Sequence, residues 1–140
     1  KVTNDTTVLD IGTGSGILAI AADLLGAKSA IGVDIDAQSV KTAIQNAEIN
    51  GVSEKTEFLV GDLADKISGK YDIVCANIVA DVVIRLFDNV ADFMKDDGIL
   101  IVSGIIDMRA AEVEASAIEH GFTISESLMR EEWHAYVLTK

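Results

Sequence analysis

The 140-residue chain has no proline, a single cysteine and an aromatic content of only 5%. About seven prolines would be ordinary at this length. No stretch resembles a Pro-rich or Gly/Ser-rich linker, an internal repeat or a low-complexity tract, so we expect residues 1–140 to form one domain. The lone cysteine, Cys75, excludes an internal disulfide and fits a reducing compartment, and we interpret it as a small core residue.

Basic residues and long apolar runs are also scarce. The chain has 11 Lys and Arg against 23 Asp and Glu, a formal net charge of −12. Nucleic-acid binding normally needs a basic surface that displaces counterions. We therefore expect no direct nucleic-acid binding and instead attraction of a basic partner, although solubility alone also explains the charge. No apolar run reaches about 18 residues and no secretory leader is present, so we expect no membrane span and a cytoplasmic location.

Apolar residues make up 49% of the chain and form short continuous runs that alternate with segments of helical periodicity. The short runs predict strands and the periodic segments predict helices. A turn at residues 96–98 precedes the fifth strand. Strands are expected at 7–10, 30–33, 56–60, 71–76 and 99–102, helices at 17–25, 36–50, 81–94 and 107–120, and a final strand pair at 122–129 and 133–139.

The early strands are apolar throughout, which indicates a mostly parallel sheet buried on both faces by helices. The polar junction at residues 130–132 favours a hairpin between the last two strands. We predict an α/β fold with a Rossmann-like, doubly wound, seven-stranded, mostly parallel sheet and a C-terminal antiparallel hairpin. Right-handed crossovers bring the carboxyl ends of the strands to one edge, where open α/β sheets bind ligands. The side chains at those ends are Asp10, Asp34, Asp62, Asn77 and Ser103.

The most informative segment, residues 8–16, contains a strand, a glycine turn and the start of a helix. Gly12 and Gly14 allow a sharp turn and the close approach of a ligand, and Gly16 permits close packing of helix on strand. The glycine pattern alone also fits a site for NAD, FAD or phosphate, or a turn that binds nothing.

Asp10 makes the pattern more specific because it precedes Gly12 by two residues. Its carboxylate would repel a pyrophosphate but attract an ammonium and a sulfonium, the two cationic groups of S-adenosylmethionine. We therefore predict S-adenosylmethionine in preference to a dinucleotide. The candidate cofactor-binding residues of this segment are Asp10, Gly12, Thr13, Gly14 and Gly16.

Two further strand ends supply candidate cofactor-binding residues. Asp34 follows Gly12 by 22 residues, close to the roughly 20 expected for a carboxylate that accepts hydrogen bonds from ribose hydroxyls. Ile35 is placed to pack on adenine, while its neighbour Asp36 can cap the following helix. Asp62 and Leu63 end the third strand, where Asp62 can accept a hydrogen bond from the adenine amino group; a solvated turn aspartate is the alternative.

Asn77 ends the fourth strand and is the candidate catalytic residue, and it also counts among the cofactor-binding residues. Removing the proton from a lysine amine of pKa 10.4 at pH 7 costs about 4–5 kcal/mol, and a neighbouring carboxylate would favour the charged form. A neutral asparagine carbonyl can instead accept a hydrogen bond from the amine and orient its lone pair. The alternative is an asparagine that only turns the chain.

At these residues the chain resembles the class I S-adenosylmethionine-dependent methyltransferases, and within them the family that methylates ribosomal protein L-eleven (PrmA-like). Segments 8–22 and 32–36 are shared by many methyltransferases. The Asn-Ile-Val-Ala of residues 77–80 and the Ser-Gly-Ile-Ile of residues 103–106 are more specific to this family.

The resemblance implies methyl transfer to lysine side chains and an N-terminal amine of a large-subunit ribosomal protein, with S-adenosylhomocysteine as product and no metal. It implies that Asn77 orients the amine and that the cofactor is held by Asp10, Gly12, Gly14, Asp34, Ile35 and Asp62. Family members usually carry an N-terminal substrate-recognition domain, and we expect this chain to lack it, because it begins at Lys1 shortly before the first strand.

Two other functions stay open at the level of sequence. One is a methyltransferase for a nucleic-acid base or a small molecule, although residues 77–80 lack the prolines and the aromatic that would stack a base. The other is a cofactor-binding fragment without turnover. We expect His120 to interact with a helix C-terminus, and Trp133 to pack in the final hairpin or, alternatively, to line the substrate cleft.

Overall fold

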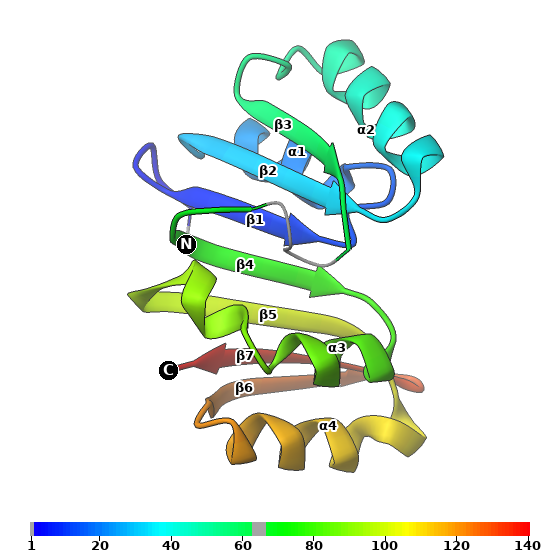
Figure 1. Cartoon of the computed structure of the whole chain (residues 1–140), viewed down its shortest axis with the longest axis vertical. Helices are drawn as coiled ribbons and strands as arrows, with labels where there is room; N and C mark the ends of the chain where they lie inside the picture. Colours follow the sequence, from blue (N-terminus) through cyan, green and yellow to red (C-terminus); the bar gives the residue numbers. More distant parts are fainter. Residues whose placement is uncertain (1, 63–66) are drawn as a thin grey trace.

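The computed structural model describes residues 2–62 and 67–140 and confirms the predicted fold class. A seven-stranded sheet has the order β3-β2-β1-β4-β5-β7-β6 (Figure 1). Five strands are parallel, and β7 pairs antiparallel with both β5 and β6. The strands are β1 (Thr7–Ile11), β2 (Ser29–Asp34), β3 (Thr56–Val60), β4 (Tyr71–Asn77), β5 (Met94–Ile106), β6 (Thr123–Arg130) and β7 (Trp133–Thr139).

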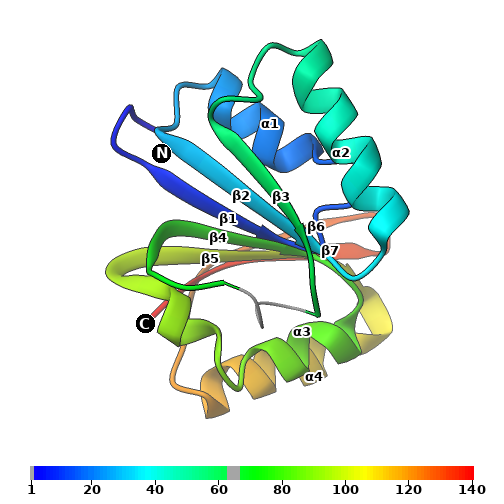
Figure 2. The same ribbon diagram turned by 45° about the horizontal axis from the view of Figure 1, so that its top comes forward.

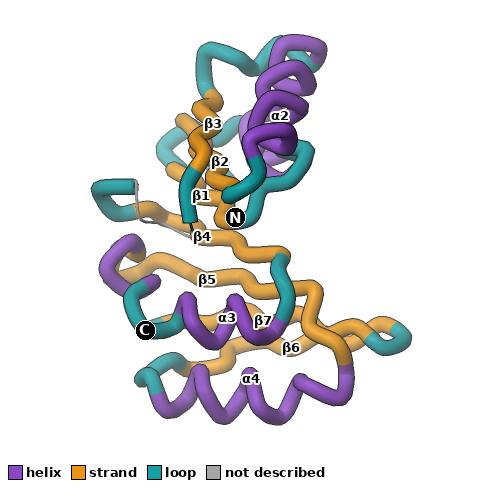
Figure 3. Tube along the Cα trace, turned by 45° about the vertical axis from the view of Figure 1, so that its right-hand side comes forward, coloured by secondary structure: helices purple, strands orange, loops and turns teal. Residues whose placement is uncertain are grey.

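Helices cover the two faces of the sheet in separate pairs. The described residues form α1 (Ile17–Leu24), α2 (Ala37–Ile49), α3 (Ala80–Leu86) and α4 (Asp107–Glu119), with a short 3₁₀ helix, η1 (Val90–Phe93). In Figure 2, α1 and α2 lie on one side of the sheet and α3 and α4 on the other, and Figure 3 shows α3 and α4 running along the β5–β7–β6 half.

Burial on both faces explains the continuously apolar strands. In β1, Leu9 and Ile11 contribute to the core under α3 and α4, while Val8 contributes to the core under α1 and α2. A strand that faces two helical layers must be apolar on both sides, and the transfer of these side chains out of water stabilises both layers.

The parallel register brings three loops to one edge of the sheet. Ile11 at the end of β1 pairs with Val33 of β2 and with Ala76 of β4. Asn77 at the end of β4 pairs with Ser103 of β5. The chain therefore leaves β1, β2 and β4 at nearly the same level, as the crossover rule predicts.

The predicted helix at 81–94 was wrong in its second half. Helix α3 ends at Leu86, η1 follows, and β5 already begins at Met94. Asn89 adopts φ −140°, which breaks the helix, yet Val90 and Met94 remain buried. The helical spacing of apolar residues therefore continues past the end of the helix. These side chains are buried in the core whether or not the backbone is helical, so their spacing does not show where the helix ends.

The predicted turn at residues 96–98 is part of a longer strand. Tyr71 pairs with Met94 and Ile73 with Ile99, so the register of β4 and β5 shifts between these pairs. The residues of the predicted turn thus form an irregularity inside β5, which runs from Met94 to Ile106 instead of from 99 to 102.

The burial of Asp23 predicts how the free energy of unfolding depends on pH. Both of its carboxylate oxygens are buried without a hydrogen-bond partner among the described residues. Burial raises the pKa of Asp23 to about 6, with a partial offset from the positive charge of Lys55. Because the folded chain binds this proton more tightly than the unfolded chain, the free energy of unfolding falls as pH rises from about 4 through 6.

We expect Asp23→Asn to reduce that loss of stability by about 2 kcal/mol between pH 4.5 and pH 7.5. Urea unfolding at both pH values measures the difference. Asp5→Asn, at an exposed position, makes the same change in net charge and serves as the control. An unaltered pH slope in Asp23→Asn would contradict the assignment.

Candidate functional site

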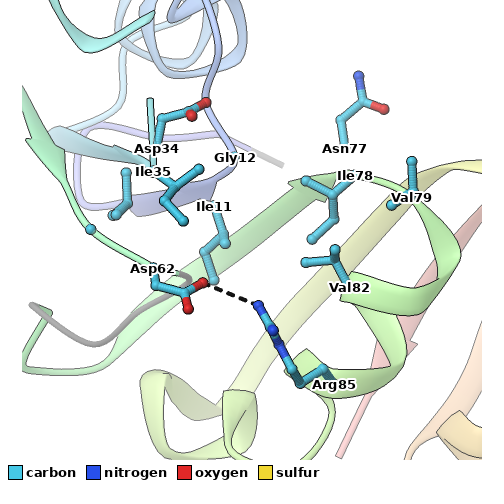
Figure 4. Close-up of a pocket in the computed structure, with 12 residues that line it drawn as sticks. Ile11, Gly12, Asp34, Ile35, Asp62, Asn77, Ile78, Val79, Val82 and Arg85 are labelled. Atoms are coloured by element: carbon cyan, nitrogen blue, oxygen red, sulfur yellow. Dashed lines mark hydrogen bonds and ion pairs between the residues drawn. The ribbon is translucent and has the colours of Figure 1, made fainter. Parts of the chain in front are cut away.

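A cavity of about 460 Å³ opens at the edge of the sheet where β1, β2 and β4 end (Figure 4). Its walls come from four loops and from α3. The lining residues are Ile11, Gly12, Val33, Asp34, Ile35, Gly61, Asp62, Asn77, Ile78, Val79, Val82 and Arg85.

The glycine turn between β1 and α1 has a left-handed backbone at each of its glycines. Gly12, Gly14 and Gly16 have φ values of 74°, 57° and 85°. A Cβ on Gly12 would collide with the side chain of Ile78, so the absence of one allows the β1 and β4 loops to touch. A Cβ on Gly14 would meet nothing within 4 Å, so the backbone of the glycine turn borders open space at this residue.

Gly16 packs against α2 and β3, so its close packing involves more than the helix and strand that the sequence indicated. A Cβ there would lie 2.9 Å from Cβ of Ala43 and 3.1 Å from Cζ of Phe58. This glycine therefore sets how closely the start of α1 approaches its neighbours.

Asp34 links the glycine turn to the second loop. Its Oδ2 accepts a hydrogen bond from the backbone N–H of Gly14 at 2.9 Å, and its Oδ1 accepts one from the N–H of Asp36 at 2.9 Å. Asp36 in turn caps α2 by accepting from the N–H of Gln38, as the sequence predicted. Ile35 is 70% exposed at the cavity wall.

Asp10 lies beneath the glycine turn and does not line the cavity. Its Oδ2 accepts a hydrogen bond from the hydroxyl of Thr13 at 2.8 Å, while its Oδ1 is buried without a partner among the described residues. Burial raises the pKa of Asp10 to about 7; the Thr13 hydrogen bond lowers it, and the negative charge of Asp34 raises it further. A cation near this carboxylate would recover much of the lost solvation.

An ion pair crosses the far end of the cavity. Nη2 of Arg85 donates to Oδ1 of Asp62 at 3.1 Å (Figure 4). The sequence analysis did not identify Arg85 as a site residue. The sequence feature that could have indicated it is its position three residues after Val82 on α3, because this spacing puts both side chains on one face of the helix.

Asn77 is exposed at the end of β4, and its side chain points away from Arg85 in Figure 4. The backbone of β5 approaches it closely, because a Cβ on Gly104 would lie only 2.7 Å from Oδ1 of Asn77. Gly104 has φ 79°, so two features require glycine at this position.

The cavity brings together five of the predicted site residues: Gly12, Asp34, Ile35, Asp62 and Asn77. The structure places Asp10, Thr13, Gly14 and Gly16 in or below the glycine turn instead. Leu63 lies outside the described residues. Within residues 2–62 and 67–140, no group of three His, Cys, Asp or Glu could hold a metal ion, and no helix has the length and hydropathy of a membrane span.

The side chains that the sequence left outside the site have structural partners. His120 bonds to the carbonyl of Ser116 and to Asp88, and both contacts raise its pKa, as expected near a helix C-terminus. Glu114 of α4 accepts a hydrogen bond from the hydroxyl of Tyr136 at 2.6 Å. Cys75 is half-buried beside the core under α1 and α2.

Comparisons with known proteins agree with the fold and point to one family. The sequence model described as "Ribosomal protein L11 methyltransferase (PrmA)" matches residues 1–140. A ribosomal protein L11 methyltransferase of Bacillus pumilus is 43% identical over 139 residues, which are 99% of this chain and 45% of that protein. The chain therefore spans less than half the length of this curated relative.

Solved structures give the same result. The crystal structure of a ribosomal protein L11 methylase from Lactobacillus delbrueckii subsp. bulgaricus superposes with a TM-score of 0.93 and 35% identity, covering 96% of this chain and 70% of that one. An RNA methyltransferase from Salinibacter ruber, solved in complex with S-adenosyl-L-homocysteine, has a TM-score of 0.78 and 23% identity over 97% of this chain and 81% of its own. This second likeness shows the fold alone.

The packing of the glycine turn predicts a difference between two alanine substitutions. Gly16→Ala should lower the free energy of unfolding by about 2–3 kcal/mol, since it adds crowding against Ala43 to the cost of a left-handed alanine. Gly14→Ala, with open space around it, should cost only about 1 kcal/mol. Urea unfolding compares the two, and equal losses would mean that the contact with α2 does not limit the turn.

Proposed function

Because the chain belongs to the ribosomal protein L11 methyltransferase family, we propose that it binds S-adenosylmethionine and transfers its methyl group to amines of a ribosomal protein. The proposal rests on one observation: a single cavity is lined both by Asp34, a carboxylate placed to bind ribose hydroxyls, and by the neutral amide of Asn77. The substrate and the cytoplasmic setting of the reaction follow from the family and are part of the proposal.

The residues present fit this cofactor. Asp34 uses its two oxygens for the N–H groups of Gly14 and Asp36, and a carboxylate has acceptor capacity left for ribose hydroxyls. Ile35 and Val82 supply apolar surface for a purine. Burial raises the pKa of Asp10 to about 7, so a nearby cation would stabilise its charged form, and this favours a cationic amino acid over a pyrophosphate.

Asp62 is the proposed acceptor for the adenine amino group, and Leu63 completes the proposed cofactor-binding set. Because Oδ1 of Asp62 already accepts from Arg85, the ion pair would hold the carboxylate in place at the cavity wall. An exposed pair of this kind contributes little to stability, so it can open or shift when a ligand enters without a large cost.

When bound, the cofactor supplies a methyl carbon attached to a positively charged sulfur. It would supply this methyl group to the substrate amine, with S-adenosylhomocysteine and a proton released to solvent as the other products. Asn77 accepts a hydrogen bond from the amine through its side-chain carbonyl and so orients the lone pair. An amide suits this position better than a carboxylate, because a negative charge there would stabilise the unreactive ammonium form of the substrate amine.

We expect Asn77→Ala to leave the affinity for S-adenosylhomocysteine within about two-fold and to lower methyl transfer at least about 100-fold, since orientation of the amine is lost. Calorimetry measures the first quantity, and transfer of labelled methyl groups to ribosomal protein L11 measures the second. Labelled RNA with unlabelled protein would identify a nucleic-acid methyltransferase instead. Unchanged turnover in Asn77→Ala would contradict its assignment.

Two neighbouring carboxylates, Asp34 at the end of β2 and Asp36 at the N-cap of α2, allow a matched comparison. Asp34→Ala should weaken binding of S-adenosylhomocysteine about 10- to 100-fold, because it removes both the ribose acceptor and the tie to Gly14. Asp36→Ala should leave this affinity unchanged and cost only about 1 kcal/mol of stability through the lost helix cap. Equal losses of affinity in both variants would show that Asp34 acts only by supporting the loop.

A further inference from the structure

One arginine lines the candidate cofactor cavity, and the proposed function uses it only to hold Asp62. Among the described residues of the cavity wall, Arg85 of α3 is the one basic side chain, and Asp34 and Asp62 are the two acidic ones. Basic residues are scarce in this chain, with 11 Lys and Arg against 23 Asp and Glu. The contacts of Arg85 indicate what this cation could recognise.

Arg85 stands at the edge of the surface that the proposed function assigns to the purine. That surface includes Ile35 and Val82. Val82 precedes Arg85 by three residues on α3, so both side chains lie on one helical face, and Figure 4 shows the guanidinium turned toward Asp62. A purine packed on Val82 would therefore have one edge beside the ion pair.

The ion pair between Arg85 and Asp62 contributes little to the stability of the fold. Nη2 of Arg85 lies 3.1 Å from Oδ1 of Asp62, and the two side chains are 57% and 54% exposed. Solvent screens exposed pairs of this kind. What the contact does fix is an order of groups at the cavity wall, because a carboxylate that accepts hydrogen bonds stands next to a guanidinium that donates them.

Both groups can contact a ligand while they stay paired. A guanidinium carries five N–H donors in a planar fork, and a carboxylate offers about four lone-pair sites. The single contact between Nη2 and Oδ1 exhausts neither set. A base that enters the cavity can therefore meet an acceptor on Asp62 and a donor on Arg85 without breaking the pair.

The order of acceptor and donor matches one edge of adenine. Adenine has a donor at its 6-amino group and an acceptor at the adjacent N1, on the edge by which proteins recognise an unpaired base. Hypoxanthine has oxygen in place of the amino group and shows the opposite order, an acceptor at O6 and a donor at N1. Beside Asp62 and Arg85 it would set acceptor against acceptor and donor against donor, which a polar site rejects strongly.

We propose that Arg85 is a specificity-determining residue that donates a hydrogen bond to N1 of the adenine ring, while Asp62 accepts one from the amino group. This inference rests on the proposed function and adds to it a residue that recognises the base. Ile35 and Val82 offer apolar contact to any purine, so they do not distinguish one purine from another. Arg85 and Asp62 together select adenine and exclude the 6-oxo purines.

Ligand analogues that differ by one atom test the contact without requiring turnover. The 1-deaza analogue of S-adenosylhomocysteine has C–H in place of N1, so the acceptor for Arg85 is lost. The 3-deaza analogue makes the same replacement at another ring nitrogen and is the matched control. Calorimetry with the full 140-residue chain should show about 10-fold weaker binding of the 1-deaza analogue and a change within about two-fold for the 3-deaza one. Equal affinities for S-adenosylhomocysteine and its 1-deaza analogue would overturn the proposal.

Substitution of Arg85 tests the same contact from the side of the protein. Arg85→Met keeps an unbranched apolar stem but no donor, so it should weaken S-adenosylhomocysteine about 10-fold and leave the 1-deaza analogue within about two-fold, because that complex already lacks the contact. The preference for S-adenosylhomocysteine over S-inosylhomocysteine should fall at least about 10-fold. Arg130→Met, at the exposed end of β6, removes the same charge outside the cavity and should change none of these affinities.

The outcomes separate this inference from the proposed function. If Arg85 only held Asp62 in place, Arg85→Met would change the affinities for S-adenosylhomocysteine and its 1-deaza analogue by the same factor. That result would overturn the inference and leave the proposed function standing. A wild-type chain that binds none of these nucleosides would overturn the proposed function and this inference with it. Circular dichroism of each variant establishes that the fold is intact.

Discussion

The parallel pairing of β1 with both β2 and β4 is the constraint on which the rest of the structure depends. It holds Ile11 level with Val33 on one side and with Ala76 on the other. The residues that follow these positions, Gly12, Asp34 and Asn77, then meet around one cavity although they are far apart in the sequence. A shift of β1 by one residue would turn its apolar side chains to the opposite faces, so packing of the core also fixes the geometry of the site.

Two carboxyl groups, those of Asp34 and Asp10, determine the charge and hydrogen bonding at the edge of the sheet where the cavity lies. Asp34 satisfies two backbone N–H groups that the glycine turn and the following loop leave open, so it is both a structural link and the proposed ribose acceptor. Asp10 is a different case, because one of its oxygens is buried without a partner among the described residues and its pKa is raised to about 7. A buried carboxylate near neutrality favours binding of a cation, which would return the group to its charged form.

Much of the fold could be predicted because local patterns and tertiary burial agree. The strand at 56–60 and the final strand at 133–139 have the predicted bounds, and the helix predicted at 36–50 lies between its caps Asp36 and Asn50. The helix at 81–94 failed because apolar spacing does not report a backbone break such as Asn89. Arg85 was missed, and Gly104 was noted only as part of the segment 103–106, for a related reason: each acquires its role from a contact with a distant segment, Asp62 in one case and Asn77 in the other.

Gly104 shows how a residue outside the cavity can still shape it. It lies in β5, and because it has no side chain it allows the amide of Asn77 to lie against its backbone. Asn77 in turn lines the cavity that contains Asp34. The amide of Asn77 is therefore confined between this cavity and the backbone of β5, which limits the orientations that its carbonyl can adopt.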